Sequence, residues 1–265
     1  MKKTLTFIGN GNMATAMAAR LKDHYAIEVV GRDLARLDTF EAAVGTEVAK
    51  HLIDGFDLRE KTVVLCVKPA NVEEVGAKTA GKAKALFSVL AGTTLATLKK
   101  HFDARGYVRA MPNLAASLGK STTSLTGDKH LKAQALSLFE AIGTTCWLGS
   151  EKEIDIATAL AGSGPAYLAL VAEALADGAV NAGLKRDDAM TLMRGLFDGF
   201  GALIQREHPA LLKDAVMSPG GTTAAGYAAL ENAGVRNGCI DAITKAHQKA
   251  AALGNSSVDS GSRPE

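Results

Sequence analysis

A glycine loop that joins a short apolar run to a helical stretch is the feature that most constrains the fold of this 265-residue chain. The loop reads Gly9-Asn10-Gly11-Asn12-Met13-Ala14 and directly follows Leu5–Ile8. This G-x-G-x-x-A spacing is typical of dinucleotide-binding turns, in which Gly9 permits the tight turn and Gly11 lets the backbone approach a pyrophosphate. Ala14 allows the helix to pack on the strand, and the helix N-terminus offers N–H groups to the anion. We therefore predict cofactor contacts from Gly9, Asn10, Gly11, Asn12 and Met13.

Short apolar runs and helical stretches alternate through residues 1–150. The runs predict strands at Leu5–Ile8, Ala26–Val30, Thr62–Val67, Ala85–Leu90 and Tyr107–Ala110, with a further pair at Thr122–Leu125 and Thr144–Leu148. The stretches between them predict helices at Asn12–Leu21, Leu34–Ala43, Ala70–Ala80, Thr94–Phe102 and about His130–Ile142. Apolar strands separated by helices imply a parallel sheet covered on both faces. We expect an α/β fold, with a Rossmann-type doubly wound sheet as the dinucleotide-binding domain.

The sequence changes character after Trp147. Strand-like runs vanish, and Ala, Leu and Met recur at helical spacing. This pattern predicts an all-helical domain over residues 151–254, with the boundary near residues 149–153. Residues 255–265 are rich in Ser, with Gly and Pro and little apolar content, which predicts a disordered tail.

The end of the second predicted strand indicates which dinucleotide is bound. An NAD site places Asp or Glu there to bind the ribose 2′-OH, whereas an NADP site has a nearby Arg. Gly31 and Arg32 occupy the strand tip, and Arg36 follows one helical turn later. Glu28 lies mid-strand, three residues too early, and Asp33 is expected to cap the next helix. We predict NADPH, with Arg32 as a contact, and keep NADH as the less favoured alternative.

The overall charge and the scattered Cys and His residues argue against several classes of protein. The chain has 30 basic and 28 acidic residues, spread along its length, which argues against a nucleic-acid binder. No apolar run of the ~20 residues that a bilayer requires is apparent, so we expect no membrane span. The three cysteines are far apart, which favours the reducing cytoplasm. None of the six histidines has ligand spacing, so we expect no metal site.

Three further segments are unusual for a generic dinucleotide-binding chain. In Cys66-Val67-Lys68-Pro69 the proline stops a strand and leaves Lys68 at the carboxyl edge, where ligands bind in such sheets. Arg109-Ala110-Met111-Pro112-Asn113 repeats this design at a later strand. Met217-Ser218-Pro219-Gly220-Gly221-Thr222-Thr223 leads into a helix expected over 224–232.

These segments, together with Gly162-Ser163-Gly164-Pro165-Ala166-Tyr167, make the chain resemble the pyrroline-5-carboxylate reductase family. The resemblance runs from Phe7 to about Leu253, and the motifs occur in the order found in the family. Two segments depart from the family pattern, Leu114-Ala115-Ala116-Ser117 and His247-Gln248-Lys249-Ala250. Neither lies in the glycine-rich loop that precedes Thr223.

The resemblance implies the NADPH-dependent reduction of 1-pyrroline-5-carboxylate to L-proline, the last step of proline biosynthesis. It places a hydrogen bond to the substrate nitrogen on Thr223 and the active site near the interface of a homodimer or higher oligomer. Gly220 and Gly221 expose N–H groups, and the following helix directs its positive end at a carboxylate. The implied substrate-binding residues are Val216, Ser218, Gly220, Gly221 and Thr222. The implied cofactor neighbourhood adds Val67, Lys68, Pro69 and Asn113.

Other interpretations of the same residues stay open. Ser218 and Pro219 also fit an ordinary helix cap and first turn, Lys68 also fits a solvated side chain, and Asn113 also fits a turn. A hydroxyacid dehydrogenase or imine reductase would share the first domain but would be expected to place a catalytic Lys or Asp on a later helix. A non-enzymatic NADP sensor would share the fold without turnover.

Overall fold

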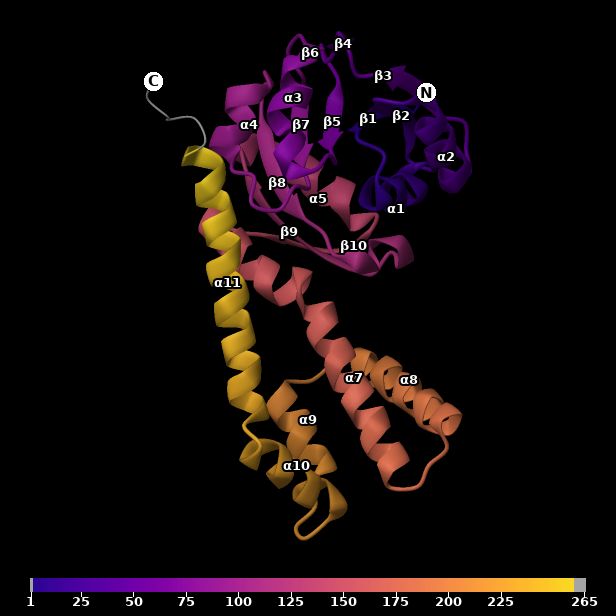
Figure 1. The fold of residues 1–265 in the computed structure, drawn as a ribbon, viewed down its shortest axis with the longest axis vertical. Coiled ribbons are helices and arrows are strands. Elements are labelled where there is room, and N and C mark those ends of the chain that lie inside the picture. Colours follow the sequence, from indigo (N-terminus) through magenta and orange to yellow (C-terminus); the bar gives the residue numbers. More distant parts are fainter. Residues whose placement is uncertain (1, 260–265) are drawn as a thin grey trace. The chain divides into compact units, whose positions relative to one another are not determined.

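The computed structural model describes residues 2–259 and divides into two compact units. One unit comprises Met1–Ser163 and Lys245–Glu265, and the other comprises Gly164–Thr244. The first holds all the strands of the described chain, and the second is helical (Figure 1). The α/β architecture predicted from the sequence, with a helical C-terminal part, is confirmed.

The first unit is built on an eight-stranded sheet with the order β10-β9-β8-β7-β5-β1-β2-β3. The strands are β1 (Lys3–Ile8), β2 (Tyr25–Gly31), β3 (Ala49–Leu52), β5 (Thr62–Leu65), β7 (Ala85–Ser88), β8 (Tyr107–Met111), β9 (Ser121–Gly127) and β10 (Gly143–Trp147). A small second sheet pairs β4 (Phe56–Asp57) with β6 (Thr79–Ala80). The chain enters at β1, adds β2 and β3 on one side, and then crosses to β5 on the other. The carboxyl ends of β1 and β5 therefore form the crevice where ligands bind in doubly wound sheets.

One strand pair departs from the predicted all-parallel sheet. β8 and β9 are antiparallel, with Arg109 opposite Thr126 and Met111 opposite Ser124. A parallel pair requires a crossover of a dozen or more residues, whereas only the short segment 112–120 connects these strands. The chain therefore turns back, and β10 then pairs in parallel with β9.

Helices cover both faces of the sheet, as predicted. They are α1 (Asn12–Leu21), α2 (Leu34–Val44), α3 (Val72–Ala77), α4 (Leu95–His101), α5 (Lys132–Glu140) and α6 (Glu151–Ala157). One core cluster contains Met17 of α1, Phe40 of α2 and Phe139 of α5, packed against Phe7 and Phe87 of the sheet. The other cluster contains apolar residues of α3 and α4.

The sequence misses three short strands and overextends one helix. β3 is an edge strand with mostly exposed side chains, so it lacks the apolar alternation by which strands are recognised. The helix expected over Ala70–Ala80 ends at Ala77, and Thr79 and Ala80 form β6. The carbonyl of Lys78 accepts a hydrogen bond from the Gly55 N–H, so the chain pairs with a distant turn instead of continuing the helix.

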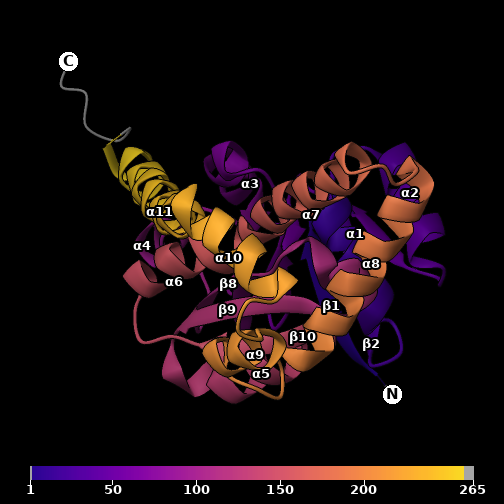
Figure 2. The same cartoon turned by 90° about the horizontal axis from the view of Figure 1, so that it is seen from below.

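The second unit contains α7 (Gly164–Asn181), α8 (Arg186–Leu203), α9 (Pro209–Val216), α10 (Thr222–Asn232) and the start of α11 (Val235–Asp259). α7 and α8 lie side by side in both views (Figure 1, Figure 2). Many of their large apolar side chains are exposed, among them Leu168, Leu170, Leu192, Leu196 and Phe200. An apolar surface of this kind marks an interface.

The second unit begins at Gly164, later than the boundary expected near residues 149–153. Ile154 of α6 is buried at 1% exposure, and Glu151 and Asp155 form ion pairs with Arg109 of the sheet. These contacts place α6 in the first unit, so the division falls after Ser163.

The predicted disordered tail also begins too early. α11 continues as a helix to Asp259, and no Gly or Pro interrupts residues 255–259. The rest of that tail, residues 260–265, lies outside the described residues.

One helical stretch of the described chain, Glu151–Asn181, is long and apolar enough to cross a membrane by length and composition alone. Its mean hydropathy reaches 1.4, and 11% of its most apolar window is buried within the chain. The expectation from the sequence missed this stretch because it considered only apolar runs. Small residues stand among the large apolar ones here, but the mean hydropathy stays high. The core helix of a soluble protein passes the same test.

Candidate active site

The first part of the site is the turn that follows β1 at the carboxyl edge of the sheet. Gly9 has a φ of +103° and donates its N–H to the carbonyl of Val30 at 2.9 Å. A Cβ at Gly9 would lie 2.7 Å from the carbonyl oxygen of Cys66, at the end of the neighbouring strand β5. Only glycine therefore fits this turn, because any side chain would clash with backbone and strain φ.

The second part is the N-terminus of α1, which is open to a ligand. Gly11 is the N-cap and supplies no side chain to the first N–H groups of the helix. A Cβ at Gly11 would meet no atom within 4 Å, so the backbone here borders free space. Asn12 is exposed and Met13 is half-buried beside it. These N–H groups and the helix dipole fit the pyrophosphate of a dinucleotide.

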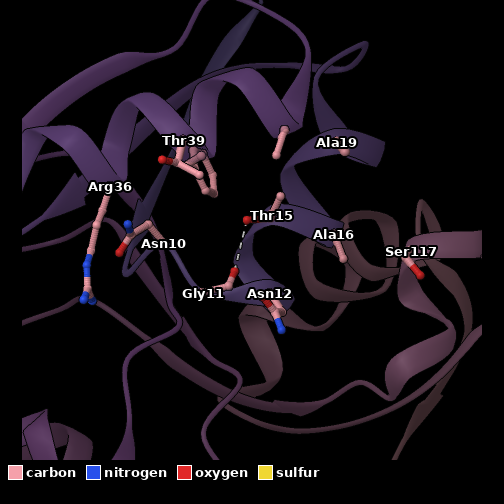
Figure 3. Close-up of a pocket in the computed structure, with 11 residues that line it drawn as sticks. Asn10, Gly11, Asn12, Thr15, Ala16, Ala19, Arg36, Thr39 and Ser117 are labelled. Atoms are coloured by element: carbon pink, nitrogen blue, oxygen red, sulfur yellow. Dashed lines mark hydrogen bonds between the residues drawn. The ribbon is translucent and has the colours of Figure 1, made fainter.

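A cleft of about 590 Å³ adjoins this helix N-terminus. It is lined by Asn10, Gly11, Asn12, Thr15 and Ala16 from the loop and α1, by Arg36, Thr39 and Phe40 from α2, and by Ser117 from the segment after β8. Figure 3 shows Arg36 beside Asn10. The Thr15 hydroxyl donates to the carbonyl of Gly11 at 3.2 Å, so this side chain reinforces the turn.

The two arginines near the tip of β2 have different surroundings. Arg36 lines the cleft, and its ion pair with Asp33 is long, at 3.9 Å. Arg32 instead pairs with Glu74 of α3 at 3.8 Å and is not among the cleft residues. Sequence reasoning chose Arg32 because it stands at the strand tip. The helical spacing of Arg36, Thr39 and Phe40 is the signal that would have indicated the cleft-lining face of α2.

The acidic residue of β2 is unavailable to a ribose. Glu28 is 6% exposed and accepts hydrogen bonds from the Thr6 hydroxyl and from the Lys61 ammonium at 2.8 Å, and it lies 3.0 Å from His51. At the strand tip, a Cβ on Gly31 would lie only 2.8 Å from a methyl group of Leu37. A side chain at this position would therefore require Leu37 to move.

The segment after β5 lies next to the glycine turn. The Val67 nitrogen would be 3.1 Å from a Cβ on Gly9, which places these two loops in direct contact. Lys68 and Pro69 are exposed at the same edge. Burial raises the pKa of the Cys66 thiol, which disfavours the reactive thiolate.

Asn113 has a defined structural role. Its carboxamide oxygen accepts the Ala115 N–H at 3.1 Å, and its Nδ2 donates to the Ala161 carbonyl at 3.1 Å. Its backbone N–H donates to the Ser121 hydroxyl at 3.0 Å. The proposed contact of Asn113 with the nicotinamide remains a prediction.

The glycine-rich loop of the second unit forms a tight turn between α9 and α10. The Gly221 N–H donates to the Ser218 carbonyl at 3.0 Å, with Pro219 and Gly220 between them. Gly220 has a φ of +69°, which with the preceding proline is typical of a type II turn. Gly221 is the N-cap of α10 and provides no side-chain cap. The first N–H groups of α10 are therefore available to an anion.

The side chains around this turn are accessible in the single chain. Val216, Ser218, Thr222 and Thr223 are exposed, and Gly221 is half-buried. The predicted substrate residues thus lie together on one exposed turn and at the adjoining helix ends.

A buried ion-pair cluster was missed by the sequence analysis. Arg109 of β8 is 3% exposed, and its guanidinium lies 2.9 Å from Glu151 and 3.2 Å from Asp155 of α6. Glu151 also accepts the Leu95 N–H at 2.8 Å. The spacing of Glu151 and Asp155, one helical turn apart, was the available signal, but nothing in the sequence identifies their distant partner. Within residues 2–259, no group of three His, Cys, Asp or Glu side chains is arranged to hold a metal ion.

Two family models match the chain. Residues 151–253 match pyrroline-5-carboxylate reductase dimerisation, and residues 4–92 match NADP oxidoreductase, coenzyme F420-dependent. A pyrroline-5-carboxylate reductase of Synechocystis sp. is 39% identical, with 96% of this chain and 99% of that protein covered. The chain belongs to the pyrroline-5-carboxylate reductase family. The resemblance drawn from the motifs is confirmed.

Other pyrroline-5-carboxylate reductases agree with this assignment. The Glycine max protein is 38% identical, with 94% of this chain and 96% of that protein covered. The structure from Coxiella burnetii superposes with a TM-score of 0.79 at 31% identity, covering 96% of this chain and 99% of that one. A structure of the Plasmodium falciparum reductase with NADP bound shares the fold, with a TM-score of 0.77 at 24% identity and coverage of 96% and 100%.

Proposed function

We propose that this family member reduces 1-pyrroline-5-carboxylate to L-proline with NADPH, in the last step of proline biosynthesis. The imine nitrogen is protonated first; hydride then adds to the imine carbon, and the π pair of the C=N bond becomes the lone pair of the neutral secondary amine. NADPH supplies the hydride. The observation that carries the proposal is the presence of two open helix N-termini, at Gly11 and Gly221, in a reductase-family chain. An assay of NADPH oxidation with the cyclic imine, with proline identified as product, tests it.

The turn before α10 is proposed to hold the substrate. The N–H groups at the start of the helix bind the carboxylate, because the helix dipole favours an anion there. Ser218, Gly220, Gly221 and Thr222 shape this pocket, and Val216 supplies apolar contact. The protonated imine donates its N–H to the hydroxyl oxygen of Thr223, which fixes the ring while the nitrogen loses its positive charge.

Thr223→Ala is expected to lower kcat about ten- to a hundredfold, because one hydrogen bond worth roughly 1–3 kcal/mol at the reacting nitrogen is lost. Gly221→Ala should instead raise KM for the imine, since the added Cβ would lie 2.4 Å from the Ser218 hydroxyl oxygen and disturb the turn. NADPH binding should change little in both. Thr244→Ala, which removes a hydroxyl bonded only to the Ile240 carbonyl, is the matched control. Full activity of Thr223→Ala would move the substrate site elsewhere.

The cofactor is proposed to lie along the glycine turn and the cleft between α1 and α2. The residues assigned to contact it are Gly9, Asn10, Gly11, Asn12, Met13, Arg32, Val67, Lys68 and Pro69, and Asn113 is assigned to its neighbourhood. Arg36 is added as the guanidinium that lines the cleft. A guanidinium binds phosphate in a bidentate manner, which suits the 2′-phosphate of NADPH.

Arg36→Ala is expected to reduce the NADPH/NADH ratio of kcat/KM about ten- to a hundredfold, as charge-assisted hydrogen bonds to phosphate are lost. Arg32→Ala should reduce the same ratio by only about threefold, because Arg32 does not line the cleft. Steady-state kinetics of both variants with NADPH and with NADH shows which arginine has the larger effect on this ratio. A larger effect of Arg32→Ala would assign the 2′-phosphate to the strand tip.

The exposed apolar helices are proposed to associate with a second copy of the chain. The match to the dimerisation model covers α7 and α8, and a partner would bury the leucines that the single chain exposes. We therefore assign the exposed apolar side chains of α7 to a protein interface instead of a membrane. Residues 1–150 are proposed as the dinucleotide-binding domain and residues 151–254 as the dimerisation domain, although α6 itself packs on the first unit. The described cysteines are free, which fits the cytoplasm.

A further inference from the structure

We propose that Asn113 is a positioning residue that replaces a backbone donor missing from the helix leading into the second unit. In an α-helix the carbonyl of Ala161 would accept the N–H of residue 165. That residue is Pro165, which has no N–H and whose ring disfavours the α-helical turn before it. The Ala161 carbonyl is therefore left without its helical donor by the sequence itself.

The backbone around Ala161 shows the consequence. Residues Thr158–Gly162 form a π-helical turn, and the Ser163 N–H donates to the Thr158 carbonyl at 3.0 Å, five residues back. Within this widened turn the Ala161 carbonyl accepts a hydrogen bond from the Asn113 Nδ2, at 3.1 Å. Single π-helical turns of this kind are frequent at functional sites.

The orientation of the Asn113 side chain is fixed by its other contacts. Its Oδ1 must be the acceptor, because it faces the Ala115 N–H at 3.1 Å. The backbone N–H of Asn113 is held by Ser121, whose hydroxyl lies 3.1 Å from that of Thr123. The carboxamide can therefore donate only toward the Ala161 side, so the hydrogen bond to the π-helical turn is built into the loop.

Two ion pairs also join β8 to α6, which directly precedes the π-helical turn. Arg109, four residues before Asn113, forms ion pairs with Glu151 and Asp155 at the start of α6. The segment Glu151–Gly162 is thus held to β8 and its exit loop at three points. A Cβ on Gly162 would lie 3.5 Å from the Met111 methyl group, so side chains also pack closely at this place.

We call the Asn113 hydrogen bond and the two Arg109 ion pairs the clamp. Its inferred role is to hold the segment Glu151–Gly162, which precedes α7, against the carboxyl edge proposed to bind the cofactor. This role rests on the proposed function, because hydride transfer requires the cofactor and the substrate to be held at a fixed distance. The clamp should therefore act on kcat, whereas a direct contact of Asn113 with the nicotinamide would act on NADPH affinity as well.

The test combines Asn113→Ala with Pro165→Ala. Asn113→Ala should lower kcat about three- to tenfold, in line with one lost hydrogen bond, and should leave the Kd of NADPH within about twofold. Asn113→Asp keeps the acceptor for Ala115 but cannot donate, so it should lose as much kcat. In the double variant the alanine at 165 provides the N–H that Ala161 lacks, so removing Asn113 should cost little relative to Pro165→Ala alone. Absence of this rescue, or a Kd of NADPH weakened equally in the single and double variants, would overturn the proposal.

Urea unfolding of the wild-type chain, Asn113→Ala, Pro165→Ala and their double variant separates this inference from the proposed function. If the wild-type chain does not reduce the cyclic imine, the proposed function fails. The midpoints of urea unfolding still test whether Asn113 replaces the missing backbone donor. Effects of the two substitutions that are less than additive support donor replacement, because the residues then share one acceptor. Additive effects would contradict it.

Discussion

Gly9→Ala is expected to lower the free energy of unfolding by about 2–4 kcal/mol and to abolish measurable NADPH binding. The residue would have to keep a φ of +103° and place its Cβ 2.7 Å from the carbonyl oxygen of Cys66. Backbone strain of this kind costs about 1–3 kcal/mol, and the obstacle is the backbone of β5, which cannot rotate away. The turn would shift, and the α1 N-terminus that follows it would no longer face the pyrophosphate. Urea unfolding and a fluorescence titration with NADPH measure the two effects.

Gly11→Ala is the matched control, since it makes the same chemical change two residues later. Its Cβ meets no atom within 4 Å, and its φ of −80° suits any residue. The stability should change by less than about 1 kcal/mol, while NADPH should bind at least about tenfold more weakly because the methyl group blocks the close approach of the pyrophosphate. Wild-type affinity in Gly11→Ala would remove the cofactor from this loop. An unchanged urea midpoint in Gly9→Ala would show that the turn accommodates a side chain.

Arg109→Met is expected to destabilise the protein by about 3 kcal/mol. The substitution keeps an apolar chain of similar length but leaves Glu151 and Asp155 without their cation, and Asp155 is only 18% exposed. Removing one partner of a buried ion pair costs about 3–5 kcal/mol, because the remaining charge is poorly solvated. We use the lower end because Glu151 is 33% exposed. Chemical denaturation gives the difference directly.

Arg105→Met provides the comparison for a surface pair. Arg105 binds Glu60, and both side chains are more than half exposed, so its loss should cost less than about 1 kcal/mol. A triple variant that combines Arg109→Met with Glu151→Gln and Asp155→Asn should recover much of the lost stability, since no unpaired charge remains. Equal destabilisation by Arg105→Met and Arg109→Met would mean that burial adds nothing to the Arg109 cluster.

The parts of the fold that follow from local chemistry could be predicted from the sequence. The helix expected over Asn12–Leu21 has the observed bounds, because the glycine loop fixes its start. The edge strand β3 could not be predicted, since its mostly exposed side chains show no apolar alternation. The antiparallel pairing of β9 depends on the length of a connection, which a search for apolar runs ignores. Partnerships between distant residues, such as Arg109 with α6, have no local signature at all.

In the candidate site, too, the features set by local backbone chemistry could be predicted, whereas those set by distant contacts could not. The turn at Gly9 and the turn at Gly220 are local backbone requirements, and both glycines have the positive φ that their motifs imply. The position of Arg36 in the cleft depends on how α2 packs against α1, which the strand-tip rule does not consider. The assignment of Arg32 to the cofactor remains a prediction. The role of Thr223 remains a prediction, because its hydroxyl is exposed in the single chain and no local contact defines what it binds.

The packing at the tip of β2 limits how cofactor preference could evolve in this chain. A carboxylate at position 31 would be the direct route to NADH, but the methyl group of Leu37 occupies the space that its Cβ needs. Leu37 is itself fully buried in the core, so trimming it first would leave a cavity that costs stability. A carboxylate at position 31 therefore requires the Leu37 side chain to move within the core. A single-step route to NADH at this position passes through a repacked Leu37, and that repacking favours the persistence of NADPH.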